Sequence, residues 1–119
     1  MAAKPKTARA AAAKTLDSVL NKGLSLAQLL PEWEQRLDID QRSLYKEICY
    51  GSSRWFYYLT PLVHSQLKKP LKPKDSDLFA LLIIGAYQLE FMRVPEHAAI
   101  NETVNVAREW KKEWACGLI

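Results

Sequence analysis

A long apolar segment, Leu78–Met92, constrains the fold of this chain more than any other feature of its sequence. Hydrophobic side chains occupy most faces of a helix built from it, and such a helix is stable in water only when other helices surround it. Its uncharged part, from Leu78 to Tyr87, is about half the length that a membrane span requires. Asp75-Ser76-Asp77 precedes the segment with residues that favour a helix start. We therefore expect a helical bundle built around this buried segment.

Helix-starting and helix-ending residues predict two further helices at the start of the chain. The first, Thr7–Leu20, is rich in alanine, the strongest helix former, and Asn21-Lys22-Gly23 ends it. The second opens at Ser25-Leu26-Ala27-Gln28, which has the form of a capping box, and runs toward Leu37.

A third helix is expected to begin at Asp38 or Asp40 and to continue past Trp55. Gly51 inside it costs about 1 kcal/mol relative to alanine, so we expect a neighbouring helix to approach closely there. The core-facing stripe of this helix follows three- and four-residue spacing and comprises Leu44, Ile48, Gly51, Ser52, Trp55, Leu59, Leu62 and Val63.

The last predicted helix starts at Pro95 and reaches Trp114. Proline lacks an N–H group, which costs nothing at the first position of a helix, and Glu96 in the first turn suits the helix dipole. Asn101 is a weak helix former, which indicates a polar residue kept for a reason. A face of small residues suited to close packing comprises Ala98, Ala99, Ile100, Val104 and Ala107. The pattern predicts an all-α fold of five helices in one domain, because 119 residues leave room for a single core.

Three sequence motifs, taken together, resemble those of NusB-like domains. Pro95–Glu102 has the form Pro-x-His-Ala-Ala-x-Asn-Glu, Leu44–Arg54 has the form Leu-x-x-Glu-x-x-x-Gly-x-x-Arg, and Ala86–Leu89 leads into Arg93-x-Pro95. The first form is similar to the branch fused to rRNA 5-methylcytosine methyltransferases. From about Thr7 to Ile119, the chain resembles the N-terminal domain of the small-subunit rRNA cytosine-C5 methyltransferase B family. The resemblance implies an antiparallel helical bundle that binds RNA.

The resemblance also implies that the family's last helix or helices and its catalytic domain are missing. Ala115–Ile119 resembles the start of a further segment, so we expect a fragment with an open apolar groove. The related enzymes transfer a methyl group from S-adenosylmethionine, whose site is then expected in the missing domain and not in this chain.

No catalytic, cofactor or metal site is evident in the residues themselves. Cys49 and Cys116 match neither the Thr-Cys and Pro-Cys contexts of the related enzymes nor the spacing of a zinc site, and we expect small core residues. His97, with Glu96 and Glu102, has no nucleophile nearby, which favours a structural, hydrogen-bonding role. A cofactor loop would need clustered glycines after a strand, whereas the glycines here are isolated: Gly23, Gly51, Gly85 and Gly117.

The basic surplus is concentrated at the N-terminus. The chain has 17 Lys and Arg against 13 Asp and Glu, and residues 1–16 contain Lys4, Lys6, Arg9 and Lys14 and no acid. The other 13 basic residues balance the acids, so the net charge of +4 resides in this region. It indicates an anionic partner, of which nucleic acid is the commonest; the alternative is a solubilising tail.

The expected RNA contacts lie in three places. Residues 1–6 form a predicted flexible basic arm whose Lys4 and Lys6 can follow phosphates. NusB-like domains contact RNA with a basic first helix, which implies roles for Arg9 and Lys14. A basic loop is the third place, with a solvated loop as the alternative. Its lysines are Lys68, Lys69, Lys72 and Lys74, and the nearby Asp75 and Asp77 dilute their charge.

Trp55, Phe56, Tyr57 and Tyr58 are consecutive aromatic residues. Four consecutive positions span about 300° of a helix, so they cannot all enter one core. Trp55 follows the apolar stripe. The other three either stack on RNA bases or pack on a second helix or the missing domain.

We expect an accessory domain that helps a methyltransferase engage small-subunit rRNA in the cytoplasm, with its own C-terminal catalytic domain as second partner. No membrane or metal partner is expected, and two cysteines that need no pairing fit a reducing compartment. One alternative is a stand-alone NusB-type antitermination factor that binds RNA with a ribosomal protein, although the motif at Pro95 argues against it. Another is a docking domain that contacts no RNA.

Overall fold

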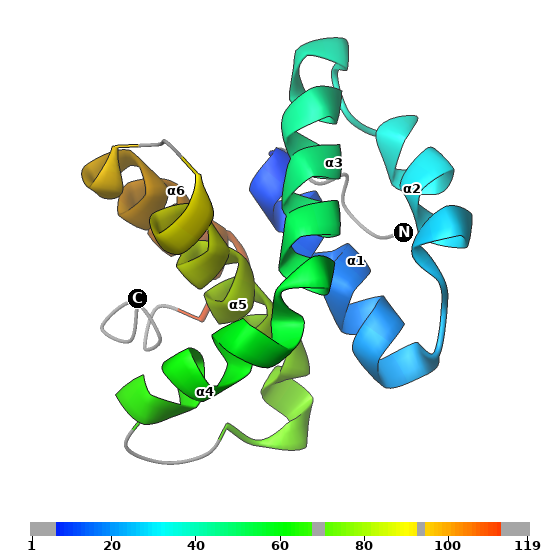
Figure 1. The fold of residues 1–119 in the computed structure, drawn as a ribbon. Helices are drawn as coiled ribbons and strands as arrows, with labels where there is room; N and C mark the ends of the chain where they lie inside the picture. The colour runs from blue at the N-terminus through cyan, green and yellow to red at the C-terminus, as the bar shows by residue number, and fades with distance from the viewer. Residues whose placement is uncertain (1–6, 68–70, 93–94, 113–119) are drawn as a thin grey trace.

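Six α-helices and one short 3-10 helix make up the described part of the chain (Figure 1). The computed structural model describes residues 7–67, 71–92 and 95–112. No strand occurs within these residues, and the predicted all-α class is confirmed. The elements are α1 (Ala8–Lys22), α2 (Leu26–Glu34), α3 (Ile39–Arg54), α4 (Phe56–Gln66), η1 (Pro73–Asp75), α5 (Ser76–Phe91) and α6 (Glu96–Glu109).

The segment predicted to be buried forms α5, at the centre of the bundle. Helices α1, α3, α4 and α6 all pack against it, whereas α2 packs on α1 and α3 on their other side (Figure 1). Its buried residues are Leu78, Ala80, Leu81, Leu82, Ile83, Ile84, Tyr87 and Gln88. Each large aliphatic side chain contributes about 1.5–3 kcal/mol on burial, which makes α5 the main source of stability. Although α5 is apolar, no helix in the described ranges is long and apolar enough to cross a membrane.

Helix α1 packs closely on α5 and α3 because its inner face consists of small side chains. Ala8, Ala10, Ala11, Ala12 and Ala13 are all buried. Its ends follow the predicted signals. Thr7 Oγ1 accepts a hydrogen bond from Ala10 N at 3.2 Å, and Gly23 adopts a left-handed φ of 68° that ends the helix. The predicted helix is confirmed, with its last turn extended to Lys22.

The capping box predicted at the start of α2 is present. Ser25 Oγ accepts a hydrogen bond from Gln28 N at 3.2 Å, and Ser25 N donates to Gln28 Oε1 at 3.1 Å. The helix ends before Leu37, which is buried beyond it. At the start of α3, Asp38 occupies the N-cap position without a side-chain hydrogen bond, and Asp40 lies in the first turn.

The single helix predicted through Trp55 is wrong, because the structure divides it at this residue. Helix α3 ends immediately before Trp55 and α4 begins immediately after it. Gly51-Ser52-Ser53 precedes the break, and glycine–serine pairs are common sites of helix kinks. The change of direction removes Trp55 from the core stripe and leaves it 40% exposed, whereas Leu59 and Val63 stay buried.

An apolar cavity of about 270 Å³ lies between α4, α5 and α6. Its apolar walls include Leu62, Val63 and Leu67 after or within α4, Leu82 and Leu89 on α5, and Ala99 and Ile100 on α6. Ala115–Ile119, the segment whose resemblance led us to expect an open groove, lies outside the described residues.

Tyr87 packs directly on the backbone of Gly51, the glycine inside α3 where the sequence predicted that a neighbouring helix approaches closely. A Cβ atom at Gly51 would overlap the Tyr87 ring at Cζ, Cε1 and Oη. Tyr87 is only 8% exposed, so its ring has little room to move aside. The predicted close approach is confirmed, and α5 is the helix that makes it.

We expect Gly51→Ala to lower the free energy of unfolding by about 1–3 kcal/mol, because the added methyl group must displace the Tyr87 ring. Gly85→Ala in α5 is the matched control, since its Cβ would lie 3.5 Å from Thr103 Cγ2, an ordinary contact. Alanine's better helix propensity, about 1 kcal/mol, should make that variant neutral or more stable. Urea unfolding measures both. Equal midpoints for the two variants would contradict the close packing.

Candidate nucleic-acid interface

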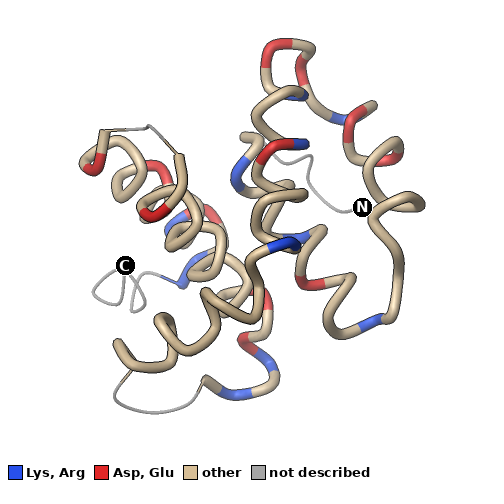
Figure 2. Tube along the Cα trace, in the orientation of Figure 1, with Lys and Arg blue, Asp and Glu red and all other residues tan. Residues whose placement is uncertain are grey.

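Half of the basic residues predicted to bind RNA lie in the described part of the chain. Arg9 and Lys14 are on α1, and Lys72 and Lys74 are at η1. Figure 2 shows basic and acidic positions interspersed along the trace and not gathered into one block. The other predicted residues, Lys4, Lys6, Lys68 and Lys69, lie outside the described residues.

The buried side chain of Gln88 holds the Arg9 side chain. Arg9 Nε donates a hydrogen bond to Gln88 Oε1 at 2.6 Å. Gln88 is fully buried, and its Nε2 donates to Ile84 O at 3.2 Å, so its own helix fixes its orientation. The two terminal nitrogens of Arg9 make no hydrogen bond within the described ranges. These nitrogens are therefore the part of the guanidinium that can bind an anion.

Burial lowers the pKa of Arg9, and the carboxylate of Glu102 on α6 opposes this shift. The guanidinium stays charged at neutral pH, because an arginine side chain is not deprotonated in proteins. Arg9 is thus a half-buried cation with one acid nearby. Partial loss of water strengthens the attraction between such a cation and a phosphate.

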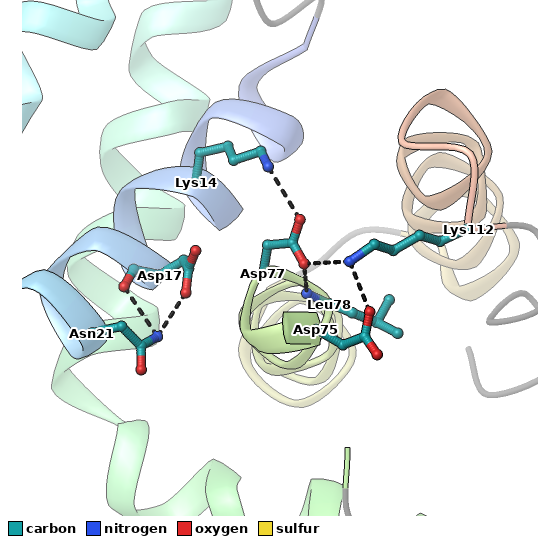
Figure 3. A network of polar contacts seen from close by, with 7 residues as sticks. All are labelled: Lys14, Asp17, Asn21, Asp75, Asp77, Leu78 and Lys112. Carbon is teal, nitrogen blue, oxygen red and sulfur yellow. Dashed lines mark hydrogen bonds and ion pairs between the residues drawn. The ribbon is translucent and has the colours of Figure 1, made fainter. Parts of the chain in front are cut away.

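Lys14 belongs to an ion-pair network that joins α1, the start of α5 and the segment after α6 (Figure 3). Lys14 Nζ lies 3.1 Å from Asp77 Oδ2 and 4.4 Å from the ring centroid of Trp110. Lys112 Nζ lies 2.7 Å from Asp77 Oδ1 and 3.0 Å from Asp75 Oδ1. Two lysines and two aspartates sum to no net charge, so the network is locally neutral.

The pKa values within this network are shifted in opposite directions. Burial would raise the pKa of Asp77, but the hydrogen bonds from Lys112 and Lys14 outweigh it, and the pKa lies below its ordinary value. Burial would lower the pKa of Lys112, whereas Asp77 and Asp75 raise it. A phosphate that reaches Lys14, whose side chain is 40% exposed, must therefore compete with Asp77.

Lys72 and Lys74 are exposed and take part in no ion pair within the described ranges. The sequence predicted that Asp75 and Asp77 dilute their charge. Instead, both aspartates pair with Lys112, and Asp75 is only 6% exposed. In the part of the chain that the structure describes, the two lysines at η1 therefore carry charge that no carboxylate compensates.

A comparison with known protein families matches residues 6–119 to the NusB family. The chain belongs to the NusB family. It is 43% identical over 111 residues to the ribosomal RNA small subunit methyltransferase B of Pseudomonas syringae pv. tomato. The protein of that name from Vibrio cholerae is 41% identical, and the probable one from Coxiella burnetii is 39% identical, over the same length.

Each of these matches covers 93% of this NusB-family chain but only 25% or 26% of the relative. The chain therefore spans about a quarter of the length of the curated relatives it matches. The family resemblance predicted from the three motifs is confirmed.

The NusB-type motif at the start of α6 is arranged partly as predicted. Pro95 takes the N-cap position, one residue earlier than expected, and Glu96 lies in the first turn. His97 and Asn101 are exposed, and the hydrogen bonds predicted for them are not found among the described residues. Arg93 lies outside those residues. The small-residue face is present, with Ala99 and Ala107 buried.

Cys49 is a core residue of this NusB-family bundle, as predicted. It is 2% exposed, and burial raises the pKa of its thiol to about 12. A thiol that stays protonated at neutral pH is a poor nucleophile. Cys116 lies outside the described residues, and within them no three His, Cys, Asp or Glu side chains are grouped as metal ligands.

Sequence reasoning missed Gln88 and Lys112. A signal for Gln88 was present, because a polar side chain within an apolar helix needs a buried partner. Lys112 had no such signal, since Asp77 and Asp75 are 35 and 37 residues away along the chain.

We expect Arg9→Ala to lower the free energy of unfolding by about 1–3 kcal/mol, because the buried Gln88 Oε1 loses its donor. Adding Gln88→Leu should recover part of this loss, since the unpaired oxygen is then removed. A double-mutant cycle by urea unfolding should give a coupling of about 0.5–3 kcal/mol. The control pair, Arg36 and Glu32, is exposed and should couple by about 0.5 kcal/mol or less. Equal couplings for both pairs would contradict the role of Gln88.

We expect the ion pairs of Asp77 to make stability depend on pH. Its pKa is lowered by folding, so the contribution is present above the unfolded value, about 3.9, and is lost as pH falls through the folded pKa. Asp77→Asn should cost about 1–2 kcal/mol at neutral pH and almost nothing well below the folded pKa.

Urea unfolding from neutral to strongly acidic pH measures this difference. Glu32→Gln, which breaks the exposed pair with Arg36 at 3.3 Å, should change stability by about 0.5 kcal/mol or less. A cost of Asp77→Asn that did not vary with pH would show that the charge pairs are not its origin.

Proposed function

We propose that this chain is the N-terminal, RNA-binding domain of an rRNA cytosine-C5 methyltransferase, and that it helps the enzyme engage small-subunit rRNA in the cytoplasm. The proposal is supported by 43% identity over 93% of the chain to a relative named ribosomal RNA small subunit methyltransferase B. Because the chain spans about a quarter of that relative, methyl transfer from S-adenosylmethionine belongs to the remaining part of the protein.

The observation that carries the proposal is the geometry of Arg9. Its Nε donates to Gln88 Oε1 at 2.6 Å, while its two terminal nitrogens make no hydrogen bond among the described residues. A guanidinium presents a rigid fork of N–H donors that matches a phosphate. Because Gln88 already restricts the side chain, less conformational entropy is lost when Arg9 binds its ligand.

Three further described cations extend this surface. Lys14 lies on α1 with Arg9, and Lys72 and Lys74 are exposed at η1. Contacts of this kind position RNA through its phosphates and do not read its sequence. With four phosphate contacts, the affinity should fall with salt at a log–log slope of roughly −3 to −4. Lys4, Lys6, Lys68 and Lys69 are proposed as additional contacts that would steepen the slope.

One observation favours a second function, a docking domain that contacts no RNA. The charge of Lys14 is compensated by Asp77 at 3.1 Å, so this part of the surface is neutral without any ligand. In that case Lys14 stabilises the bundle only. The two functions differ in whether the domain binds RNA in a salt-dependent manner.

We expect Lys72→Gln/Lys74→Gln to weaken binding to a small-subunit rRNA hairpin and to make the salt slope shallower by about 1.5. Stability should be retained, because neither lysine is paired within the described ranges. Fluorescence anisotropy over a series of salt concentrations measures affinity and slope together.

The control variant, Lys22→Gln/Lys46→Gln, removes the same charge from exposed positions on α1 and α3, and the surface ion pair that it breaks, Lys46 with Glu34 at 3.4 Å, should contribute little to stability. If both double variants made the salt slope of RNA binding shallower by the same amount, the interface at η1 would be rejected. The binding would then reflect non-specific electrostatic attraction between the whole domain and RNA. If the wild-type protein showed no salt-dependent binding to RNA, the result would support the docking function instead.

A further inference from the structure

Four aromatic rings, from the α3–α4 junction, α4 and the C-terminal part of α5, form a cluster. We call Trp55, Tyr58, Tyr87 and Phe91 the aromatic face. The rings of Trp55 and Phe91 are stacked with centroids 4.8 Å apart. Those of Tyr87 and Tyr58 lie 5.6 and 5.8 Å from the Phe91 ring. The break between α3 and α4 is what places Trp55 on this surface.

Three of the four rings of the aromatic face are exposed to solvent, whereas Tyr87 is buried beneath them at 8% exposed. Trp55 and Phe91 are each 40% exposed and Tyr58 is 50% exposed. Because each ring is held against another, a partner that covered them would cost little side-chain entropy. Clustered aromatic rings that remain exposed on a folded domain mark an interaction surface.

The charges around the aromatic face favour protein over RNA. After the larger effect of burial, the carboxylate of Glu47 also raises the pKa of Tyr87, so an acid lies close to this surface. Among the described residues, the cation over a ring of the face is Arg54, with Cζ 5.8 Å from the Trp55 centroid. Surfaces that stack RNA bases carry many cations along the backbone path. Aromatic rings beside an arginine are instead common in the core of protein interfaces.

We propose that the aromatic face docks the methyltransferase domain of the same polypeptide through apolar side chains of that domain. This inference rests on the proposed function. The curated relatives are about four times as long as this chain, and the proposed function places the methyltransferase domain in a region that corresponds to their additional length. A covalent link gives an effective concentration in the millimolar range, and a small interface then suffices. Contacts of about 600–1,500 Å² are usual between domains of one chain.

Docking at this surface would also orient the proposed RNA-binding residues. Tyr87, in the aromatic face, and Gln88, which holds Arg9, are consecutive on α5. Consecutive helix positions differ by about 100° in direction, so the two surfaces lie on neighbouring sides of the helix. A catalytic domain fixed on one side would therefore meet rRNA held on the other at a defined angle.

Hydroxyl-radical footprinting of the full-length native protein, read by mass spectrometry, tests the proposal. Tyr57 is the internal control, since it neighbours Tyr58 on α4 but is 90% exposed and lies outside the aromatic face. We expect Tyr58 to be oxidised at least about fivefold more slowly than Tyr57, because the centre of an interface is fully desolvated. Trp55 and Phe91 should be protected with it.

Two substitutions separate docking from other causes of protection. Tyr58→Glu should restore the oxidation of Trp55 and Phe91, because a charge cannot be buried in an apolar interface. Tyr57→Glu should leave both protected. If Tyr58→Glu does not fold, the footprint of the wild-type protein decides the question by itself.

Several results would overturn the proposal. Oxidation of Tyr58 at more than half the Tyr57 rate would show an open surface. Protection only after addition of an rRNA fragment would make RNA the occupant, and protection lost on dilution would indicate a second copy of the chain. If the face is open while RNA binding stays salt-dependent, docking fails and the proposed function stands. A native product of only 13.6 kDa would overturn both.

Discussion

The burial of α5 is the constraint on which the rest of this structure depends. Four helices must approach it closely enough to exclude water, and small residues permit that approach. On α1 these residues are the alanines from Ala8 to Ala13. On α3 the residue is Gly51, and the Tyr87 ring occupies the space that a side chain there would fill. The apolar driving force is spread over many side chains, but the geometry depends on a few positions where one methyl group would be too large.

The same burial organises the polar surface. Gln88 lies in the apolar helix and must be satisfied, and Arg9 on α1 supplies the partner. Near the other end of α5, Asp77 pairs with Lys14 and with Lys112. Helix α1 therefore lies along α5, with Arg9 bound near the C-terminal end of α5 and Lys14 bound near its N-terminal end. Arg9 and Lys14, two of the cations proposed to engage rRNA, also attach α1 to the core, so substitutions of these two residues change stability as well as binding.

Much of the fold could be predicted because its signals are local. Thr7, Gly23 and Ser25 act on neighbours within one helical turn, and they start or end helices as expected. The break at Trp55 could not be predicted in the same way. A Gly-Ser-Ser stretch only weakens a helix, and the stacking of Trp55 on Phe91 depends on a residue far along the chain. In the candidate site, the basic residues could be named from the sequence, but the carboxylate that pairs with Lys14 and the amide that holds Arg9 could not.

The sequence by itself determined the helical class, the buried central helix, most helix ends and membership of the NusB family. Periodicity, capping and turn residues act over a few positions, and motifs are read in order along the chain. Only the tertiary structure decided that Lys14 is paired while Lys72 and Lys74 have no ion-pair partner among the described residues, that Gln88 holds Arg9, and which aromatic rings remain exposed. Ion pairs, buried hydrogen bonds and ring stacking depend on distances in space between residues that are remote in sequence, and folding alone sets those distances.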